Sequence, residues 1–198
     1  MARRSTIGFL LAVLAFPIIG GCGDDDNPVE PSGDTEETAF PIPTFVAVSD
    51  GSFVMGSPVD EPGRVDSQET QHTVTLTTAF EIASTEVTNE QYAALAQWAL
   101  DNGYCTATPS SLRDAIGSAA EELLDLDDED CEVSFADGEL VVDAGKENHP
   151  VTEVTWFGAV AYCDWLSLYA GLAPAYDHDS WECNGHAPYS AEGYRLPT

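Results

Sequence analysis

The sequence has 198 residues, with 6 Lys and Arg against 35 Asp and Glu, so its formal net charge is −29. Hydrophobic residues make up 43% of the chain, which is enough apolar material for one domain rather than two. A chain this acidic repels phosphate backbones and anionic headgroups, so the composition excludes nucleic acid as a partner. It also excludes membrane attachment through basic side chains.

The first 21 residues have the features of a secretory signal peptide. Arg3 and Arg4 precede an almost wholly apolar run from Ile7 to Ile19, and two glycines lie directly before Cys22. The run is shorter than the roughly 20 residues of a spanning helix. The pattern resembles a bacterial lipoprotein signal, and the alternative is an ordinary signal with an incidental cysteine. We therefore predict an exported protein that is lipid-anchored through Cys22 to the bacterial cell envelope, facing the periplasm or the outer surface.

Residues 22–43 are rich in acidic residues, Pro, Ser and Gly, and they hold few large apolar side chains. Such a segment cannot bury enough surface to offset the entropy of ordering it. We predict a disordered acidic tether over 22–43 and a folded domain over 44–198.

The folded part begins with short strands. Residues 45–48 and 52–55 flank Asp50-Gly51, a pair that favours a tight hairpin turn. Residues 72–83 alternate apolar side chains with threonines, which predicts a half-buried strand with a bend near Thr78.

Two helices are predicted from their capping residues. Thr88 begins a capping box that opens a helix reaching about Asn102. Thr155 begins a second helix from 156 to about 170. The apolar stripe of the second helix leaves Asp164 and Ser167 on the predicted solvent side.

Residues 104–145 are predicted to form an insertion on the surface. Within it, Ser110 or Ser111 could cap a helix that ends near Leu124. Residues 133–142 carry Asp137-Gly138 between two apolar runs, which predicts a hairpin.

No motif for nucleophilic, phosphate-binding or metal-dependent catalysis is present, so no catalytic residue is assigned. The acidic run from Asp125 to Glu132 could attract calcium, but it lacks the spacing of a known loop, and a solvated acidic face is favoured. His178 lies among ligand-type side chains whose spacing fixes no coordination geometry. We assign no metal to either place. The neighbours of His178 are Asp177, Asp179, Glu182 and His186.

Four cysteines remain besides Cys22, and an even number in an exported chain indicates disulfides. Three connectivities are open. The pairs Cys105–Cys131 and Cys163–Cys183 would close loops of moderate length and stabilise the domain by about 2–4 kcal/mol each. The competing hypothesis is a reactive thiol, for which no cysteine has a flanking His or Arg.

Four blocks of the sequence, in order, carry a family resemblance. They are Ser52-Phe53-Val54-Met55-Gly56-Ser57, then the segment 74–92 with Glu86-Val87-Thr88-Asn89, then the segment 149–167 that begins His149-Pro150-Val151, then Gly193-Tyr194-Arg195-Leu196-Pro197-Thr198. Together they resemble the formylglycine-generating enzyme, or sulfatase-modifying factor, family over about residues 52–198.

The resemblance implies an α+β fold of the irregular, C-type-lectin-like class, loop-rich, with short strands and two or three helices. The motif residues are expected to be structural, with Trp156 and Trp165 supplying core area. The sequence departs from the family at Gln71, where a proline is usual, and at Gly158, where an acidic residue is usual. The structural motif residues are Met55, Gly56, Glu86, Asn89, Trp156, Arg195, Leu196 and Pro197.

The resemblance also implies an activity. Family enzymes oxidise a client cysteine to formylglycine with a copper-binding cysteine pair, and they hold structural calcium; some relatives perform iron-dependent oxidation. Those ligands lie beyond the Arg-Leu-Pro-Thr motif, which the family continues with Glu-Ala-Glu-Trp-Glu, whereas this sequence stops at Thr198. We therefore expect a truncated domain that is inactive and holds no cofactor. The alternative function is a non-catalytic lipoprotein that binds a protein or glycan on the same scaffold.

Overall fold

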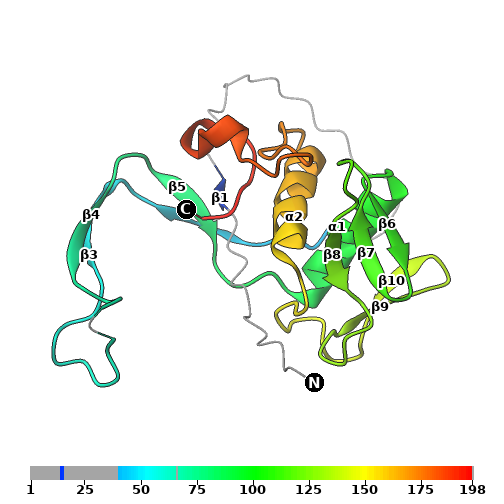
Figure 1. The fold of residues 1–198 in the computed structure, drawn as a ribbon, viewed down its shortest axis with the longest axis horizontal. Helices are drawn as coiled ribbons and strands as arrows, with labels where there is room; N and C mark the ends of the chain where they lie inside the picture. The colour runs from blue at the N-terminus through cyan, green and yellow to red at the C-terminus, as the bar shows by residue number, and fades with distance from the viewer. Residues whose placement is uncertain (1–13, 16–39, 66, 198) are drawn as a thin grey trace, which may run out of the picture.

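The computed structural model describes residues 14–15, 40–65 and 67–197. These residues form two α-helices, ten short strands and two 3₁₀ turns joined by many loops (Figure 1). The predicted α+β, loop-rich class is confirmed. None of the helices in the described ranges is long and apolar enough to cross a membrane. Of the predicted signal peptide only Leu14–Ala15, strand β1, is described, and Cys22 lies outside these ranges.

Helix α1 spans Asn89–Asp101 and has the predicted capping box. The Thr88 hydroxyl accepts a hydrogen bond from the Gln91 amide at 3.2 Å, and the Thr88 amide donates to the Gln91 side chain at 3.0 Å. The helix ends before Gly103, whose φ of +78° suits glycine. The predicted start and end are confirmed within one residue.

Helix α2 spans Trp156–Tyr169, and Thr155 caps it by accepting from the Gly158 amide at 3.0 Å. The predicted solvent side is wrong, because Asp164 and Ser167 are both 0% exposed. Helix α1, strand β8 and the chain after residue 171 surround α2, so every side chain from 158 to 167 is buried. An apolar stripe marks one buried face, but it cannot reveal that the opposite face is covered as well.

The first strands pair differently from the prediction. Strand β2, Phe45–Val48, pairs with β5, Phe80–Ala83, which also pairs with β1. Strand β3, Gly51–Met55, pairs with β4, His72–Leu76. The strands are as predicted, and the predicted bend near Thr78 is a break between β4 and β5. The prediction that β2 and β3 form a hairpin at Asp50-Gly51 is wrong. Because β4 and β5 separate at this break, β2 and β3 each pair with a different half, and the β3–β4 pair extends away from the body (Figure 1).

Five strands occupy the block predicted to be an insertion. They are β6, Cys105–Thr108; β7, Ser111–Asp114; β8, Glu122–Asp125; β9, Val133–Ala136; and β10, Glu139–Val142. The β9–β10 hairpin is confirmed, and its turn residues Asp137 and Gly138 have φ of +56° and +91°. The predicted helix over 110–124 is wrong, since Ser111 begins β7 and residues 122–125 form β8 in one antiparallel sheet.

This block belongs to the core rather than to the surface alone. Leu112, Leu123 and Leu124 are each 0% exposed and pack in the same cluster as the two helices. A Cβ at Gly158 would lie 2.0 Å from the Leu123 carbonyl oxygen, which no real contact allows. The backbone of β8 therefore crosses the first turn of α2 at a position where only glycine fits, which explains this departure from the family pattern.

The centre of the core is aromatic. Tyr92 of α1 stacks on Tyr162 of α2 with ring centroids 5.5 Å apart, and Trp165 meets Tyr92 edge-on at 6.4 Å. Trp165 is fully buried as predicted, but Trp156 is 39% exposed and contacts Trp181 at the surface. The ring of Phe40 stacks on the ring of Tyr169, the last residue of α2. Phe40 lies four residues before residue 44, the predicted start of the folded domain.

Candidate functional site

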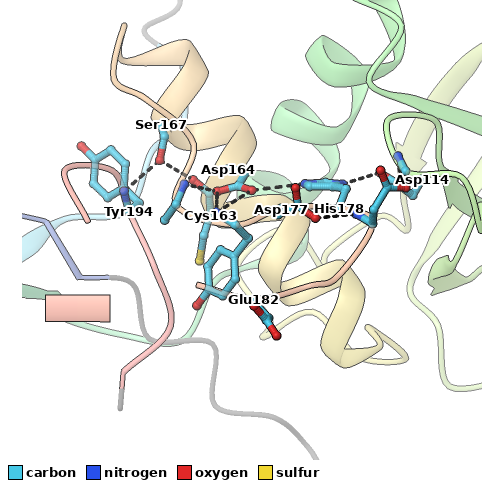
Figure 2. A network of polar contacts seen from close by, with 12 residues as sticks. Asp114, Cys163, Asp164, Ser167, Asp177, His178, Glu182 and Tyr194 are labelled. Carbon is cyan, nitrogen blue, oxygen red and sulfur yellow. Dashed lines mark hydrogen bonds and ion pairs between the residues drawn. The ribbon is translucent and has the colours of Figure 1, made fainter. Parts of the chain in front are cut away.

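The main buried polar site is a histidine held between two aspartates (Figure 2). Nδ1 of His178 lies 2.6 Å from Oδ1 of Asp114, and its Nε2 lies 3.2 Å from Oδ2 of Asp164. The exposed fractions are 6% for His178, 2% for Asp114 and 0% for Asp164. We refer to these three residues as the Asp–His–Asp cluster.

Three separate segments supply the cluster. Asp114 ends β7, Asp164 lies in the middle of α2, and His178 lies in the loop between α2 and the first 3₁₀ turn. Backbone amides satisfy the remaining carboxylate atoms: the Gly117 amide donates to Asp114 Oδ2 at 2.6 Å, and the Ala175 amide donates to Asp164 Oδ1 at 2.7 Å. The cluster therefore ties the β6–β8 sheet, α2 and the following loop together.

The surroundings set the protonation of the histidine. Burial alone would lower the pKa of His178, but its hydrogen bonds to Asp114 and Asp164 outweigh this effect and raise the pKa to about 9. Burial would raise the pKa of Asp114, yet hydrogen bonds from His178 and Gly117 bring it below its ordinary value. Burial dominates at Asp164, whose pKa is raised. A protonated imidazole therefore lies beside an ionised Asp114 carboxylate.

This arrangement limits what the cluster can do chemically. With a carboxylate oxygen against each ring nitrogen, both nitrogens of the imidazolium donate and neither is free to accept a proton. A general base needs an open nitrogen within reach of a substrate, and these three side chains are enclosed. The geometry is that of a buried ion cluster that links three segments of the chain and stabilises the fold.

The sequence placed His178 among possible ligands, and the structure brings different partners to it. Asp177 faces its own turn and accepts from the Ser180 amide at 2.8 Å, while His186 pairs at the surface with Glu182 at 2.9 Å. The ligand-type set of the loop is therefore not assembled around His178. The sequence analysis did not identify Asp114 and Asp164 as partners of His178. For Asp164 a signal was available, because it is a lone aspartate inside the strongly apolar run 159–166.

Among the described residues, one set of His, Cys, Asp or Glu side chains could approach a common ion: Asp128, Asp130 and Glu153, with one oxygen each within 4.8 Å of one another. Calcium prefers six to eight oxygen ligands. Asp128 and Asp130 are exposed, as the predicted acidic face requires, and the Asp130 amide donates a hydrogen bond to the Asp128 carboxylate at 2.9 Å. Three carboxylates on such a loop do not make a metal site, and we assign none.

The four described cysteines are free thiols, so the two predicted disulfide pairs are not formed in the structure. The Cys105 thiol donates to the Ala96 carbonyl at 3.7 Å, and the Cys131 thiol donates to the Val133 carbonyl at 3.3 Å. Burial raises the pKa of Cys105 to about 12 and that of Cys131 to about 11. Burial also raises the pKa values of Cys163 and Cys183. Thiols in this state are neither good nucleophiles nor good metal ligands.

Several motif residues have structural contacts of the expected kind. The buried Asn89 amide donates to Glu132 at 2.8 Å and to the Lys146 carbonyl at 2.9 Å, which joins the start of α1 to residues 132–146. Gly56 follows the last residue of β3, and a Cβ there would lie 2.7 Å from the Thr70 carbonyl oxygen. Glu86 is exposed, and Met55 is 54% exposed on β3.

Residues 193–197 of the last motif lie beside α2 and the loop that follows it, and beside the connection between β4 and β5. Arg195 is 3% exposed, Leu196 donates its amide to the Tyr176 hydroxyl at 3.0 Å, and Pro197 is exposed. Before them, the Tyr194 amide donates to the buried Ser167 hydroxyl at 2.8 Å. Figure 2 shows a row of polar contacts that runs from Tyr194 and Ser167, past Asp164 and His178, to Asp114.

Comparison with known proteins agrees with the sequence motifs. A solved structure titled "Structure of PvdO from Pseudomonas aeruginosa" matches with 21% identity and a TM-score of 0.40; the match covers 73% of this chain and 46% of that one, so this chain spans less than half of the solved protein. No curated protein matches the sequence. The model of the sulfatase-modifying factor enzyme 1-like domain matches residues 31–198. The chain therefore belongs to the sulfatase-modifying factor family.

Proposed function

We propose that this chain is a binding scaffold of an exported, lipid-anchored protein and does not itself oxidise a client. The observation that carries this proposal is the state of its reactive side chains. All four described cysteines have pKa values raised by burial, and the one buried histidine has both ring nitrogens occupied. A sulfatase-modifying factor fold can present loops to a partner without a reaction centre.

The copper implied by the family does not fit the described residues. The family resemblance implies a copper ion held by a pair of cysteines, and thiolate sulfur is a ligand that Cu(I) favours. The set of potential ligands that the described side chains bring together contains three carboxylates and no cysteine. No step through copper is therefore assigned to this chain.

We expect the 198-residue chain, supplied with copper and oxygen, to oxidise a Cys-x-Pro-x-Arg peptide no faster than copper alone. The product is followed by mass spectrometry as the loss of the peptide thiol and the gain of an aldehyde. The matched control is the Cys163→Ser variant, which should behave as the unchanged chain does. A rate above the copper background that disappears in this variant would overturn the scaffold proposal.

The second candidate function is oxidation of a client cysteine to formylglycine by a complete protein, with copper and structural calcium bound elsewhere. The family match over residues 31–198 favours this candidate. In that protein the present residues would hold the fold in shape and present the client, while the reaction centre would be formed by other residues.

Lipid anchoring at Cys22 supports either function, because it would hold the domain at the cell envelope. Each buried methylene of an acyl chain contributes about 0.8 kcal/mol, so two or three chains anchor a protein stably. We expect the protein made in a bacterium to partition into detergent and to begin with an acylated Cys22 by mass spectrometry. The Cys22→Ser variant should move to the aqueous phase, and the Cys131→Ser variant should not. Detergent partitioning of both variants alike would contradict the anchor.

A further inference from the structure

One buried cation lies outside the Asp–His–Asp cluster and has no anionic partner among the residues that the structure describes. Arg195 is 3% exposed, and its Nε is buried without a hydrogen-bond partner. Its Nη1 donates to the carbonyl of the adjacent Leu196 at 3.3 Å, and its Cζ lies 5.8 Å from the centre of the Tyr189 ring. Neither contact neutralises the charge. A buried guanidinium without a counter-charge is costly, which makes this site incomplete as it stands.

Arg195 lines a cavity that is large enough for a ligand group. The cavity has a volume of about 330 Å³. Apolar and hydroxyl-bearing residues share its other walls. The apolar residues come from β4, β5 and the C-terminal motif, and they are Val74, Leu76, Phe80, Ile82 and Pro197. The hydroxyl-bearing residues are Thr75, Thr77, Thr78 and Tyr189. A single planar cation beside several apolar side chains matches a carboxylate on an apolar body, because the guanidinium fork pairs with both carboxylate oxygens. A phosphate or sulfate carries about two negative charges, whereas Arg195 is the single cationic residue among those that line the cavity.

The cavity also borders the edge of a strand. Val74, Thr75 and Leu76 all line it, although side chains on a strand alternate between its two faces. Among the described residues β4 pairs with β3 alone, so its second edge keeps its backbone donors and acceptors available. An open edge beside a cavity is suited to an extended polypeptide, whose backbone can add to the sheet while one side chain enters the cavity.

We propose that the Arg195 cavity binds an aspartate or glutamate side chain of a polypeptide whose neighbouring residues are apolar. Arg195 pairs with the carboxylate, and the apolar neighbours contact β4, β5 and Pro197. The proposal rests on the binding role proposed above and names the chemistry of the partner. On the paired strand β3, the exposed Phe53 lies directly opposite Val74, so its side chain is on the same face of the β3–β4 pair as that of Val74.

The test measures binding of a fluorescent peptide, acetyl-Ser-Leu-Glu-Leu-Ser-amide with a dye on its C-terminal side, to the full 198-residue chain. Its analogue with Gln in place of Glu differs by one charge. We expect the Glu peptide to bind and the Gln peptide to bind roughly tenfold or more weakly, because a hydrogen-bonded ion pair is lost. Equal binding of the two peptides would overturn the proposal without any variant being made.

Three variants separate a binding role from a structural one. Arg195→Met keeps the apolar stem and removes the charge, so it should lose the preference for Glu while the protein melts at the same or a higher temperature. Arg195→Lys keeps the charge without the fork and should bind the Glu peptide more weakly than Arg195 does. Arg113→Met removes an exposed positive charge and should leave peptide binding unchanged.

Two outcomes would contradict the proposal. If Arg195→Met melts at a lower temperature and the unchanged chain does not distinguish Glu from Gln, Arg195 is merely structural. If free acetate competes as well as the Glu peptide does, the cavity takes a small carboxylate and the strand edge plays no part. Neither outcome bears on copper-dependent oxidation, so failure of this pocket is distinguishable from failure of the scaffold proposal.

Discussion

Replacing His178 by leucine should lower the free energy of unfolding by about 3–5 kcal/mol, because two buried aspartates then lose their shared cation. Asp114 and Asp164 are 2% and 0% exposed, so water cannot take over the role of the imidazolium. A loss of this size is a large part of the total stability of a small domain. Urea unfolding followed by tryptophan fluorescence measures it, since Trp165 is fully buried.

The matched control is His186→Leu, which removes a histidine paired with a glutamate at the surface. The His186 side chain is 78% exposed, so its loss should change the free energy of unfolding by less than about 0.5 kcal/mol. Equal effects of the two substitutions would mean that the cluster does not hold the fold together.

The pH dependence of the same measurement identifies the charge as the cause. The pKa of His178 is about 9 in the folded protein and 6.5 in its ordinary state, so its stabilisation is fully present below pH 6.5 and is lost as the pH rises through 9. At about 1.4 kcal/mol for each pKa unit, the difference corresponds to roughly 3 kcal/mol. The gap between the unchanged protein and His178→Leu should therefore narrow from pH 6 to pH 9.5. A constant gap would assign the effect to packing instead.

The second large effect is expected from Gly158→Ala. In an exposed helix this change stabilises by up to about 1 kcal/mol, because alanine is the better helix former. At position 158 the new methyl group would lie 2.0 Å from the Leu123 carbonyl oxygen, and backbone cannot move aside as a side chain can. We expect a net destabilisation of about 3 kcal/mol, since β8 must separate from α2.

The control for this substitution is Gly103→Ala after helix α1. A Cβ at Gly103 meets nothing within 4 Å, but φ is +78°, so only the backbone cost of about 1 kcal/mol is expected. If Gly158→Ala is no worse than Gly103→Ala in urea unfolding, the close approach of β8 to α2 is not required. A stabilising Gly158→Ala would show that the strand sits farther from the helix.

Local signals in the sequence predicted local structure well. The capping box at Thr88, the cap at Thr155 and the turn at Asp137-Gly138 each involve residues three or fewer positions apart, and all three are found in the structure. The same is true of the strand-like alternation over residues 72–83 and of its break near Thr78. Such signals depend on hydrogen bonds and φ preferences within one turn, which a sequence carries directly.

The errors occurred where distant segments meet. The alternation over 72–83 cannot say which strand pairs with β4 and which with β5, because β2 and β3 are both short strands that contain apolar residues. Asp164 and Ser167 looked solvent-facing because the stripe on α2 was taken as its whole buried surface. The block 104–145 was predicted to be a surface insertion, although Leu112, Leu123 and Leu124 lie in the core.

The sequence by itself determined the helix boundaries, the fold class and the family, since these depend on local chemistry and on motifs in a fixed order. Only the tertiary structure decided that His178 meets Asp114 and Asp164, 64 and 14 positions away, and that Arg195 lines a cavity without a carboxylate partner among the described residues. Burial and pairing of charges depend on which segments the folded chain brings together, and no spacing along the sequence encodes that.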